Sequence, residues 1–262
     1  MQKGFHLVIM NNADSAYTHL AQYYDRLMDV DYEEWAEYLR QIWEKLGCKP
    51  KQILELACGT GGVTIPLAQM GYEITAVDIS AEMVAAARAK AEKHSADINF
   101  IVNSMHNLDL GQQFDLTICC CDSVNYLTTD AELDGFIKQA YAHTKPGGLL
   151  LFDLNSELKL REIYGNQSYA ELDEDFSFFW DNYFDEQTEI CTMDLTFFIK
   201  VKDGLYRRVR EVHREKLWYP QVIFERLQNQ GWEIVGYFQF LTFAEPEGEA
   251  ERWQFAARKP IN

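Results

Sequence analysis

The chain is poor in basic residues and holds no apolar run long enough to cross a membrane. Its 262 residues include 24 Lys and Arg but 41 Asp and Glu, which gives a formal charge of −17. Such a charge opposes non-specific binding to phosphate backbones, so we expect no nucleic-acid partner, although a local basic site is not excluded. No apolar stretch approaches the roughly 18 residues that span a bilayer. Residues 1–10 also lack the pattern of a signal peptide, so we expect no membrane partner.

The cysteines lack a recognisable pairing pattern as well. None of the six forms a CxxC zinc pair, and three of them, Cys119 to Cys121, stand in a row. Adjacent cysteines on a strand point to opposite faces, so they cannot pair simply with one another. We therefore expect reduced, mostly buried thiols in a cytoplasmic protein, and no metal site.

What the chain does contain is enough apolar surface for a full core: 47% of its residues are hydrophobic and 14% aromatic. Short apolar segments alternate with helical patterns between residues 48 and 155. Strands are expected at about 52–57, 72–77, 98–102, 114–121 and 149–153, and helices at about 63–70, 80–94 and 130–143. This alternation predicts an α/β fold with a doubly wound, mostly parallel sheet that binds ligands within residues 48–155.

Three further segments surround this core. Residues 1–47 carry apolar side chains at helical spacing, which predicts an N-terminal helical lid. Residues 156–216 alternate apolar and polar side chains, which predicts an antiparallel β insertion that covers the site or forms a contact in a possible homodimer. Residues 217–262 predict a helix and two strands that bring the sheet to seven strands.

Charge is segregated within the predicted insertion. Residues 171–194 hold nine acids and no Lys or Arg, whereas residues 200–216 hold seven Lys or Arg against three acids. We expect the acidic and basic strands to pair with each other, because cross-strand charge pairing is the commoner use of such a pattern. The alternative is that the basic half binds an anionic substrate.

A glycine-rich turn, Cys58-Gly-Thr-Gly-Gly62, follows the first predicted strand. Glycines at such a turn let the backbone approach a ligand at a helix N-terminus. One candidate ligand is a nicotinamide or flavin dinucleotide, whose fingerprint is GxGxxG or GxGxxA. The fit is imperfect, because Thr64 occupies the third position when the motif is read from Gly59, and the first glycine is missing when it is read from Ala57.

A second interpretation fits better. The segment from Ile53 to Gly61, ILELACGTG, resembles motif I of the class I S-adenosylmethionine-dependent methyltransferases. Asp78 ends the second predicted strand, and residues 114–126 and 145–152 resemble motif IV of this family and the entry to its fifth strand. The resemblance extends in order over about residues 50–155. It implies a small-molecule methyltransferase with S-adenosyl-L-methionine as cofactor.

The resemblance also implies roles for particular residues. Glu55 would order the loop and approach the methionine amino group, and Asp78 would accept hydrogen bonds from two ribose hydroxyls. Apolar side chains after the second and third strands would enclose adenine, and the turn after the fourth strand would lie where cofactor and acceptor meet. The expected cofactor-binding residues are Tyr17, Glu55, Ala57, Cys58, Gly59, Gly61, Asp78, Ile79, Met83, Ser104, Met105, Cys121, Asp122, Asn125 and Tyr126.

Two of these residues depart from the family pattern. Ala57 replaces the first glycine of the loop, and Ser104 replaces the usual Asp, so a serine hydroxyl or a main-chain group would have to contact adenine there. Several residues also have structural alternatives. Asp78 can cap the following helix together with Ser80. Ile79 and Met83 can belong to the core, and Tyr17 to helix packing.

The expected reaction is an in-line displacement that moves a methyl group to a nitrogen or oxygen atom of a small molecule. The enzyme would mainly align the nucleophile and exclude water. A hydroxyl acceptor needs a base, for which Asp122, His143 and His213 are candidates, but we assign no catalytic residue. The acidic balance and the aromatic insertion favour an amine acceptor. The alternatives are a dinucleotide-dependent oxidoreductase and a cofactor-binding protein without turnover.

Overall fold

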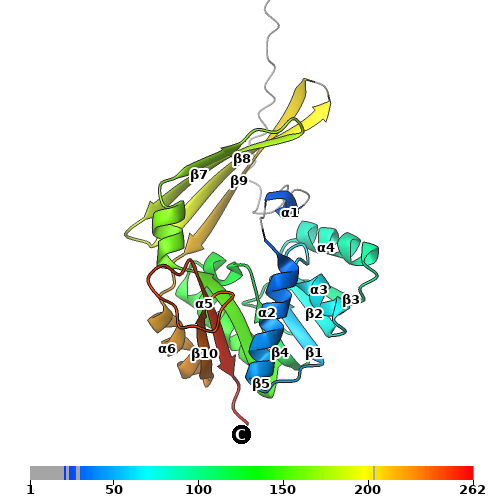
Figure 1. The fold of residues 1–262 in the computed structure, drawn as a ribbon, viewed down its shortest axis with the longest axis vertical. Helices are drawn as coiled ribbons and strands as arrows, with labels where there is room; N and C mark the ends of the chain where they lie inside the picture. Colours follow the sequence, from blue (N-terminus) through cyan, green and yellow to red (C-terminus); the bar gives the residue numbers. More distant parts are fainter. Residues whose placement is uncertain (1–20, 22–23, 28–29, 203, 262) are drawn as a thin grey trace, which may run out of the picture.

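The computed structural model describes residues 21, 24–27, 30–202 and 204–261 (Figure 1). Most of this chain forms a seven-stranded sheet in the order β10-β11-β5-β4-β1-β2-β3. Its strands are β1 (Gln52–Leu56), β2 (Glu73–Asp78), β3 (Ile98–Val102), β4 (Phe114–Cys119), β5 (Thr144–Asn155), β10 (Glu233–Gln239) and β11 (Arg252–Arg258). The first five are mutually parallel, and β11 runs antiparallel to both β5 and β10. The predicted α/β fold with a mostly parallel seven-stranded sheet is therefore confirmed.

Helices cover both faces of this sheet, with one hydrophobic cluster on each side. They are α2 (Tyr32–Lys45), α3 (Thr64–Gln69), α4 (Ala81–Lys93), α5 (Asp130–His143) and α6 (Pro220–Gln230). One cluster joins α2, α3 and α4 to the sheet, and the other joins α5 and α6 to the opposite face. No helix in the described ranges is long and apolar enough to span a bilayer.

Local sequence signals set the helix ends near the site. The carboxylate of Asp31 accepts a hydrogen bond of 2.9 Å from the backbone N of Glu34 and so caps α2. The hydroxyl of Ser80 caps α4 in the same way, through the backbone N of Met83 at 3.2 Å. Both caps place a helix N-terminus at the edge of the sheet where the parallel strands end.

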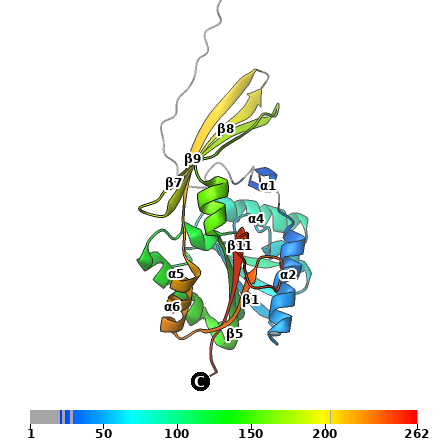
Figure 2. The same ribbon diagram turned by 60° about the vertical axis from the view of Figure 1, so that its left-hand side comes forward.

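The segment between β5 and α6 forms a second sheet. Its antiparallel strands, in the order β6-β7-β8-β9, are β6 (Ser168–Glu171), β7 (Phe176–Asp185), β8 (Ile190–Lys202) and β9 (Leu205–Lys216). A π-helical segment, Leu158–Tyr164, leads into it from β5. Figures 1 and 2 show this sheet projecting from one end of the main body, on the side where the short helix α1 (Tyr24–Leu27) lies. It therefore stands above the ends of the parallel strands.

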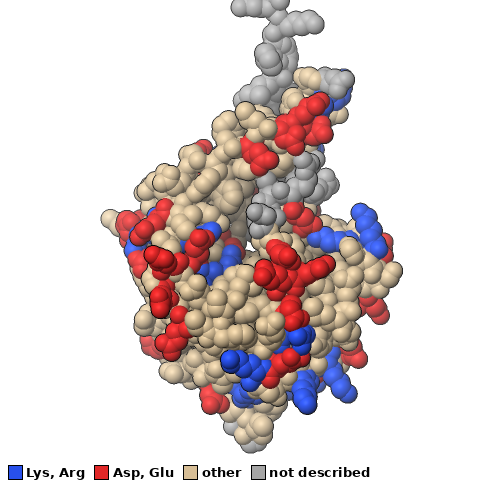
Figure 3. All heavy atoms as spheres, in the orientation of Figure 1, with Lys and Arg blue, Asp and Glu red and all other residues tan. Residues whose placement is uncertain are grey.

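Two basic residues of the second sheet form ion pairs, so the expected pairing of acidic and basic strands is seen only in part. The Nε of Arg210 on β9 donates to Asp194 of β8 at 2.7 Å, and the Nζ of Lys200 lies 2.6 Å from a carboxylate oxygen of Glu174. Acidic side chains are numerous on the face shown in Figure 3, where Lys and Arg gather mainly toward the lower edge. On β9 itself, cross-strand charge pairing is thus seen at Arg210, whereas Arg207, Arg208 and Arg214 lie opposite uncharged residues of β8.

Candidate functional site

A cavity of about 130 Å³ lies at the carboxyl ends of β1, β2 and β4. We call it the smaller cavity. It is lined by Tyr24, Tyr32, Glu55, Ala57, Cys58, Gly59, Thr60, Gly62, Val63, Asp78, Ile79, Met83, Met105, Cys120, Cys121, Ser123 and Tyr126. The glycine-rich turn, the end of β2 and the turn after β4 therefore meet around one space, as the motif order implies.

Asp78 holds the glycine-rich turn against the end of β2. Its Oδ2 accepts a hydrogen bond of 2.8 Å from the backbone N of Gly59, and its Oδ1 accepts one of 2.8 Å from the backbone N of Ser80. Burial raises the pKa of this carboxyl, although the backbone donors oppose that shift. The helix cap itself is Ser80, so Asp78 keeps its carboxylate on the cavity wall.

Glu55 places a buried carboxyl beneath the turn. It is only 2% exposed, and its Oε2 has no hydrogen-bond partner among the described residues. Burial raises its pKa to about 8, far above the ordinary value of 4.5. An unpaired carboxyl oxygen at a cavity wall is a ready partner for a ligand ammonium group.

The turn itself requires unusual backbone conformations. Ala57 has a φ of 58°, in the left-handed region that favours glycine, which explains why the family pattern has glycine here. At Gly62 a side chain is excluded instead by contact, because an added Cβ would lie 2.6 Å from the ring of Tyr32. Tyr32, the first residue of α2, therefore packs directly on the glycine-rich turn.

The apolar residues that were predicted to enclose adenine differ in solvent exposure. Met83 is 2% exposed and Ile79 is 69% exposed, yet both line the smaller cavity, as does Met105. Met83 thus serves the core and the cavity wall together, whereas Ile79 has one face open to solvent.

Four predicted residues lie elsewhere than the smaller cavity. A Cβ added at Gly61 would lie 3.4 Å from the Cβ of Ala87, and Asp122 lines the larger cavity described below. The Oγ of Ser104 contacts the Nδ1 of His106 at 3.0 Å. Asn125 is fully buried, and its amide is engaged by the backbone N of residue 155 and the backbone O of residue 216, both at 2.9 Å. Tyr17, the predicted lid tyrosine, falls outside the described residues.

A second cavity of about 440 Å³ adjoins the first. We call it the larger cavity. It is lined by Tyr24, Val30, Asp31, Tyr32, Glu34, Trp35, Cys121, Asp122, Tyr126, Lys159, Tyr164, Trp180, Met193, Leu195, His213, Glu215, Phe240, Leu241 and Arg252. Four residues, Tyr24, Tyr32, Cys121 and Tyr126, line both cavities. These four residues form the boundary between the two cavities. A ligand in the smaller cavity and a ligand in the larger cavity would meet there.

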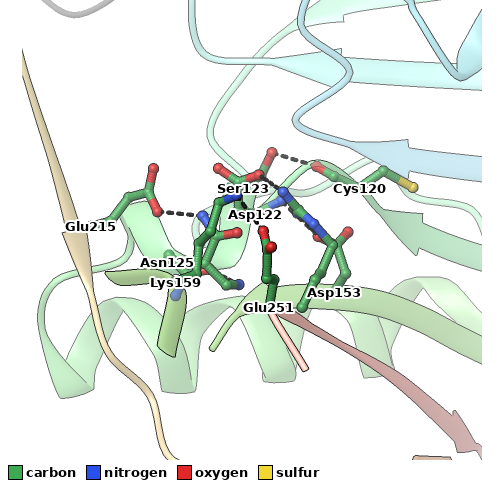
Figure 4. A network of polar contacts seen from close by, with 10 residues as sticks. Cys120, Asp122, Ser123, Asn125, Asp153, Lys159, Glu215 and Glu251 are labelled. Atoms are coloured by element: carbon green, nitrogen blue, oxygen red, sulfur yellow. Dashed lines mark hydrogen bonds and ion pairs between the residues drawn. The ribbon is translucent and has the colours of Figure 1, made fainter. Parts of the chain in front are cut away.

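An ion-pair cluster supports the floor of the larger cavity. Arg252 of β11 donates to Asp122 at 2.7 Å and also pairs with Asp153 of β5, whose Oδ2 accepts from the backbone N of Asp122 at 2.8 Å. Burial raises the pKa of Asp153 to about 6, against the opposing effect of Arg252. Figure 4 shows Asp122 between Asp153 and Glu215, and burial together with Asp122 raises the pKa of Glu215.

The turn that carries this cluster is strained. Cys121 and Asp122, which directly follow β4, have φ values of 58° and 52°. Two consecutive non-glycine residues in the left-handed region cost of order 1–3 kcal/mol each and persist only where the surroundings impose them. The cluster around Arg252 supplies that constraint at the junction of the two cavities.

Of the three candidate bases, only His213 presents an imidazole to the larger cavity. Its Nδ1 lies 3.1 Å from the Oη of Tyr126, and its Nε2 lies 3.4 Å from Oε2 of Glu211. His143 instead accepts a hydrogen bond of 3.0 Å from the backbone N of Leu110, away from both cavities. Asp122 is ion-paired as described. No cluster of His, Cys, Asp and Glu suited to a metal ion occurs among the residues that the structure describes.

The sequence analysis did not predict most of the cavity-lining residues that lie outside the motifs. Tyr24 and Tyr32 reach the site from the N-terminal helices, Trp180 from β7 and Arg252 from β11. No local pattern marks them, because only the tertiary fold brings these segments together. Gly62 was also left out of the predicted residues, but it could have been found, since it belongs to the glycine-rich turn.

Comparisons with known proteins identify the family of the chain. A family model described as "Methyltransferase domain" matches residues 53–148. The relative "Putative methyltransferase YqeM" from Bacillus subtilis (strain 168) is 33% identical over 245 residues, which cover 93% of this chain and 97% of that protein. A crystal structure of an S-adenosylmethionine-dependent methyltransferase from Clostridium acetobutylicum ATCC 824 is 28% identical with a TM-score of 0.84, covering 94% of this chain and 100% of that one.

A more distant relative carries a more specific name. The dTDP-3-amino-3,6-dideoxy-alpha-D-glucopyranose N,N-dimethyltransferase of Streptomyces fradiae is 28% identical over 123 residues, 47% of each chain. Together these findings exclude the dinucleotide-dependent oxidoreductase considered above. The chain belongs to the class I S-adenosylmethionine-dependent methyltransferases, and S-adenosyl-L-methionine is its cofactor.

Proposed function

We propose that this enzyme methylates the nitrogen of a small, amine-bearing molecule seated in the larger cavity. The carrying observation is the charge of that cavity. Its lining holds three acids, Asp31, Glu34 and Asp122, against two bases, Lys159 and Arg252. Glu215 also lines the cavity, but burial raises its pKa and so favours its uncharged form. Both bases are already paired: Arg252 as described, and Lys159 with Glu251 at 2.6 Å (Figure 4). The surplus of acid suits a cationic guest rather than an anionic one.

The walls of the larger cavity add to this preference. Trp35, Tyr126, Tyr164, Trp180 and Phe240 supply aromatic faces around the acidic groups. Aromatic faces attract ammonium groups, by about 0.5–2 kcal/mol per contact. The name of the Streptomyces fradiae relative, an amino-sugar N,N-dimethyltransferase, supports the same class of acceptor.

The smaller cavity fits the cofactor by its chemistry. Bound S-adenosyl-L-methionine supplies a methyl group on a positively charged sulfur. Glu55 offers its unpaired oxygen to the methionine amino group, and Asp78 offers carboxylate oxygens to the ribose hydroxyls. Tyr24, Tyr32 and Tyr126 line the boundary, where they align the acceptor and exclude water, which is the main contribution expected of such an enzyme.

The test is a screen of paired acceptors that differ only in an amine or a hydroxyl, such as glucosamine and glucose, extended to the dTDP-amino sugar of the Streptomyces fradiae relative. Formation of S-adenosylhomocysteine and product mass are measured. We expect turnover of amine members and at least about tenfold lower kcat/KM for their hydroxyl partners, which corresponds to about 1.4 kcal/mol. Methylation confined to hydroxyls would refute the amine assignment.

A variant pair checks the location of the acceptor. Trp180 lines the larger cavity, whereas Tyr183, on the same strand, is 61% exposed. We expect Trp180→Ala to raise KM for the acceptor while the Kd for S-adenosylhomocysteine changes less than about twofold, because the two cavities bind separate ligands. Tyr183→Ala is the matched control. Equal effects of the two substitutions would contradict the placement.

A further inference from the structure

Side chains from three distant segments meet where α1 lies against the glycine-rich turn. The Oγ1 of Thr60 in this turn donates a hydrogen bond of 2.7 Å to Oδ1 of Asp25 on α1. The Nζ of Lys90 on α4 forms an ion pair with Oδ2 of Asp25 and donates a hydrogen bond of 3.2 Å to the same Thr60 hydroxyl. Both views of the fold show α1 beside α4 (Figures 1 and 2). We call Asp25, Thr60 and Lys90 the clasp.

The clasp adjoins the wall of the smaller cavity. Thr60 lines this cavity and is only 2% exposed, and Tyr24, the residue before Asp25, lines both cavities. Asp25 and Lys90 themselves are not among the described residues that line either cavity. They therefore hold α1 against the glycine-rich turn from outside the cavities and act on a bound ligand only through the wall.

The position of α1 depends on such side-chain contacts, because the helix comprises only four residues. Isolated helices shorter than about 12–15 residues are marginal in water, so a single turn has little stability of its own. The carboxylate of Asp25 gives α1 a charged hydrogen-bond acceptor, and hydrogen bonds to charged groups are stronger than those between neutral groups. Loss of the clasp should therefore loosen α1 while the sheet and the longer helices stay in place.

We propose that the clasp gates the exchange of the cofactor and of its product, S-adenosylhomocysteine. This inference rests on the proposed function only in placing the cofactor in the smaller cavity. With the clasp closed, α1 keeps Tyr24 in the wall that both cavities share, and a bound ligand is retained. When Asp25 separates from Thr60 and Lys90, α1 moves away from the glycine-rich turn, and the ligand enters or leaves. The three clasp residues are positioning residues in this scheme.

The solvent exposure of the clasp suits a gate that opens repeatedly. The side chains of Lys90 and Asp25 are 26% and 43% exposed. Ion pairs at such partly exposed positions are weak, and dissolved salt screens them. The closed clasp therefore biases α1 toward the glycine-rich turn without holding it there permanently. Added salt should favour the open form.

The first test measures how fast S-adenosylhomocysteine binds to the full chain and dissociates from it, with no acceptor present. Lys90→Met is compared with Lys93→Met, which changes an exposed position on the same helix. We expect both rate constants to rise about fivefold in Lys90→Met, the upper range for a partly exposed ion pair. The Kd should stay within about twofold of the wild type, because a gate limits entry and exit alike. The control should match the wild type.

Two results of this comparison would overturn the proposal. One is a pair of rate constants in Lys90→Met that both lie within about 1.5-fold of the wild type. The other is faster dissociation with unchanged association, and hence a weaker Kd. That result would show that the clasp shapes the binding site itself rather than access to it.

A double-mutant cycle with Asp25→Asn tests whether the two charged residues act as one pair. This substitution removes the charge but keeps an oxygen that accepts the hydrogen bond from Thr60. The double variant with Lys90→Met should release S-adenosylhomocysteine within about twofold of the faster single variant. Release from the wild type should also quicken as NaCl rises from about 0.05 to 0.5 M, whereas release from Asp25→Asn should vary much less. Effects that multiply, or an equal salt dependence in Asp25→Asn, would refute the clasp.

Failure of the clasp and failure of the proposed function give different results. Because these measurements use no acceptor, the clasp stands even if no amine is methylated. Asp78→Ala tests the placement of the cofactor, and an unchanged Kd for S-adenosylhomocysteine in that variant would overturn the clasp as a cofactor gate. A weakened Kd in Asp78→Ala together with unaltered rate constants in Lys90→Met would refute the clasp alone.

Discussion

Glu55 allows the most direct test of the cofactor site. Its carboxyl is buried, its Oε2 lacks a partner among the described residues, and its pKa is raised to about 8. At pH 7 the free protein should therefore hold this group mostly protonated. An ammonium group placed beside it favours the carboxylate and lowers the pKa again. Binding of S-adenosyl-L-methionine is thus predicted to expel the proton of Glu55.

The size of this effect follows from the two pKa values. If the bound ammonium returns the pKa from about 8 to 4.5, the protonated fraction at pH 7 falls from about 0.9 to nearly zero. About 0.9 proton should then be released for each cofactor bound. The Kd should also tighten by about tenfold per pH unit between about pH 5.5 and 7, where the amino group of the cofactor stays charged.

Calorimetry in buffers of different ionisation enthalpy measures the released proton. Glu55→Gln should release none and should bind with a Kd that varies little over this range. Glu92→Gln, an exposed position on α4, is the matched control and should release the same proton as the wild type. Proton release that persists in Glu55→Gln would show that another group is responsible, and the assigned role of Glu55 would be wrong.

The same group predicts a stability effect without any cofactor. A carboxyl whose pKa is raised on folding binds more protons in the folded state, so the free energy of unfolding falls as the pH rises. For Glu55 this loss should occur between about pH 4.5 and 8. Denaturant unfolding of Glu55→Gln should show a shallower decline than the wild type across this window. A decline of equal slope would mean that Glu55 is not titrating there.

Three further substitutions test the remaining walls of the site. Asp78→Ala should weaken S-adenosyl-L-methionine binding by about 1–3 kcal/mol through lost charge-assisted hydrogen bonds, and an unchanged Kd in calorimetry would contradict its ribose role. Gly62→Ala should displace the ring of Tyr32, whose atoms lie 2.6 Å from an added Cβ, and so weaken both ligands; unaltered affinity for S-adenosylhomocysteine would argue against that contact. Arg252→Met should destabilise the fold by about 3–5 kcal/mol in denaturant unfolding, because it leaves two carboxylates unpaired, and a loss below about 1 kcal/mol would show that the pairs contribute little.

The cofactor half of the molecule could be predicted from sequence because its signals are local. Glu55 and Asp78 end adjacent parallel strands, and such ends meet at one edge of a sheet. The cap at Ser80 was equally predictable, since its hydroxyl accepts a hydrogen bond from a backbone N three residues later. Gly59 and its neighbours needed only the motif to place them beside Asp78.

The acceptor half could not be predicted in the same way. Tyr32, Trp180 and Arg252 come from α2, β7 and β11; Trp180 follows Tyr32 by 148 residues, and Arg252 follows Trp180 by 72. Their meeting depends on how the second sheet is set above the parallel strands. Asn125 shows the converse difficulty: it lies inside a recognisable motif, yet its amide ties the short helix η2 (Ser123–Tyr126) to the backbone of β5 and β9.

The turn after β4 shows why the two halves must be considered together. Cys121 lines both cavities and Asp122 lines the larger one, and both adopt a left-handed backbone that glycine would hold without strain. Glycine at position 122 would remove the strain but also the carboxylate that pairs with Arg252. Since β11 follows the second sheet in the chain, the conformation next to the cofactor depends on a residue that the earlier motifs do not contain. Substitution of Arg252 in the wall of the larger cavity should therefore also change ligand binding in the smaller cavity.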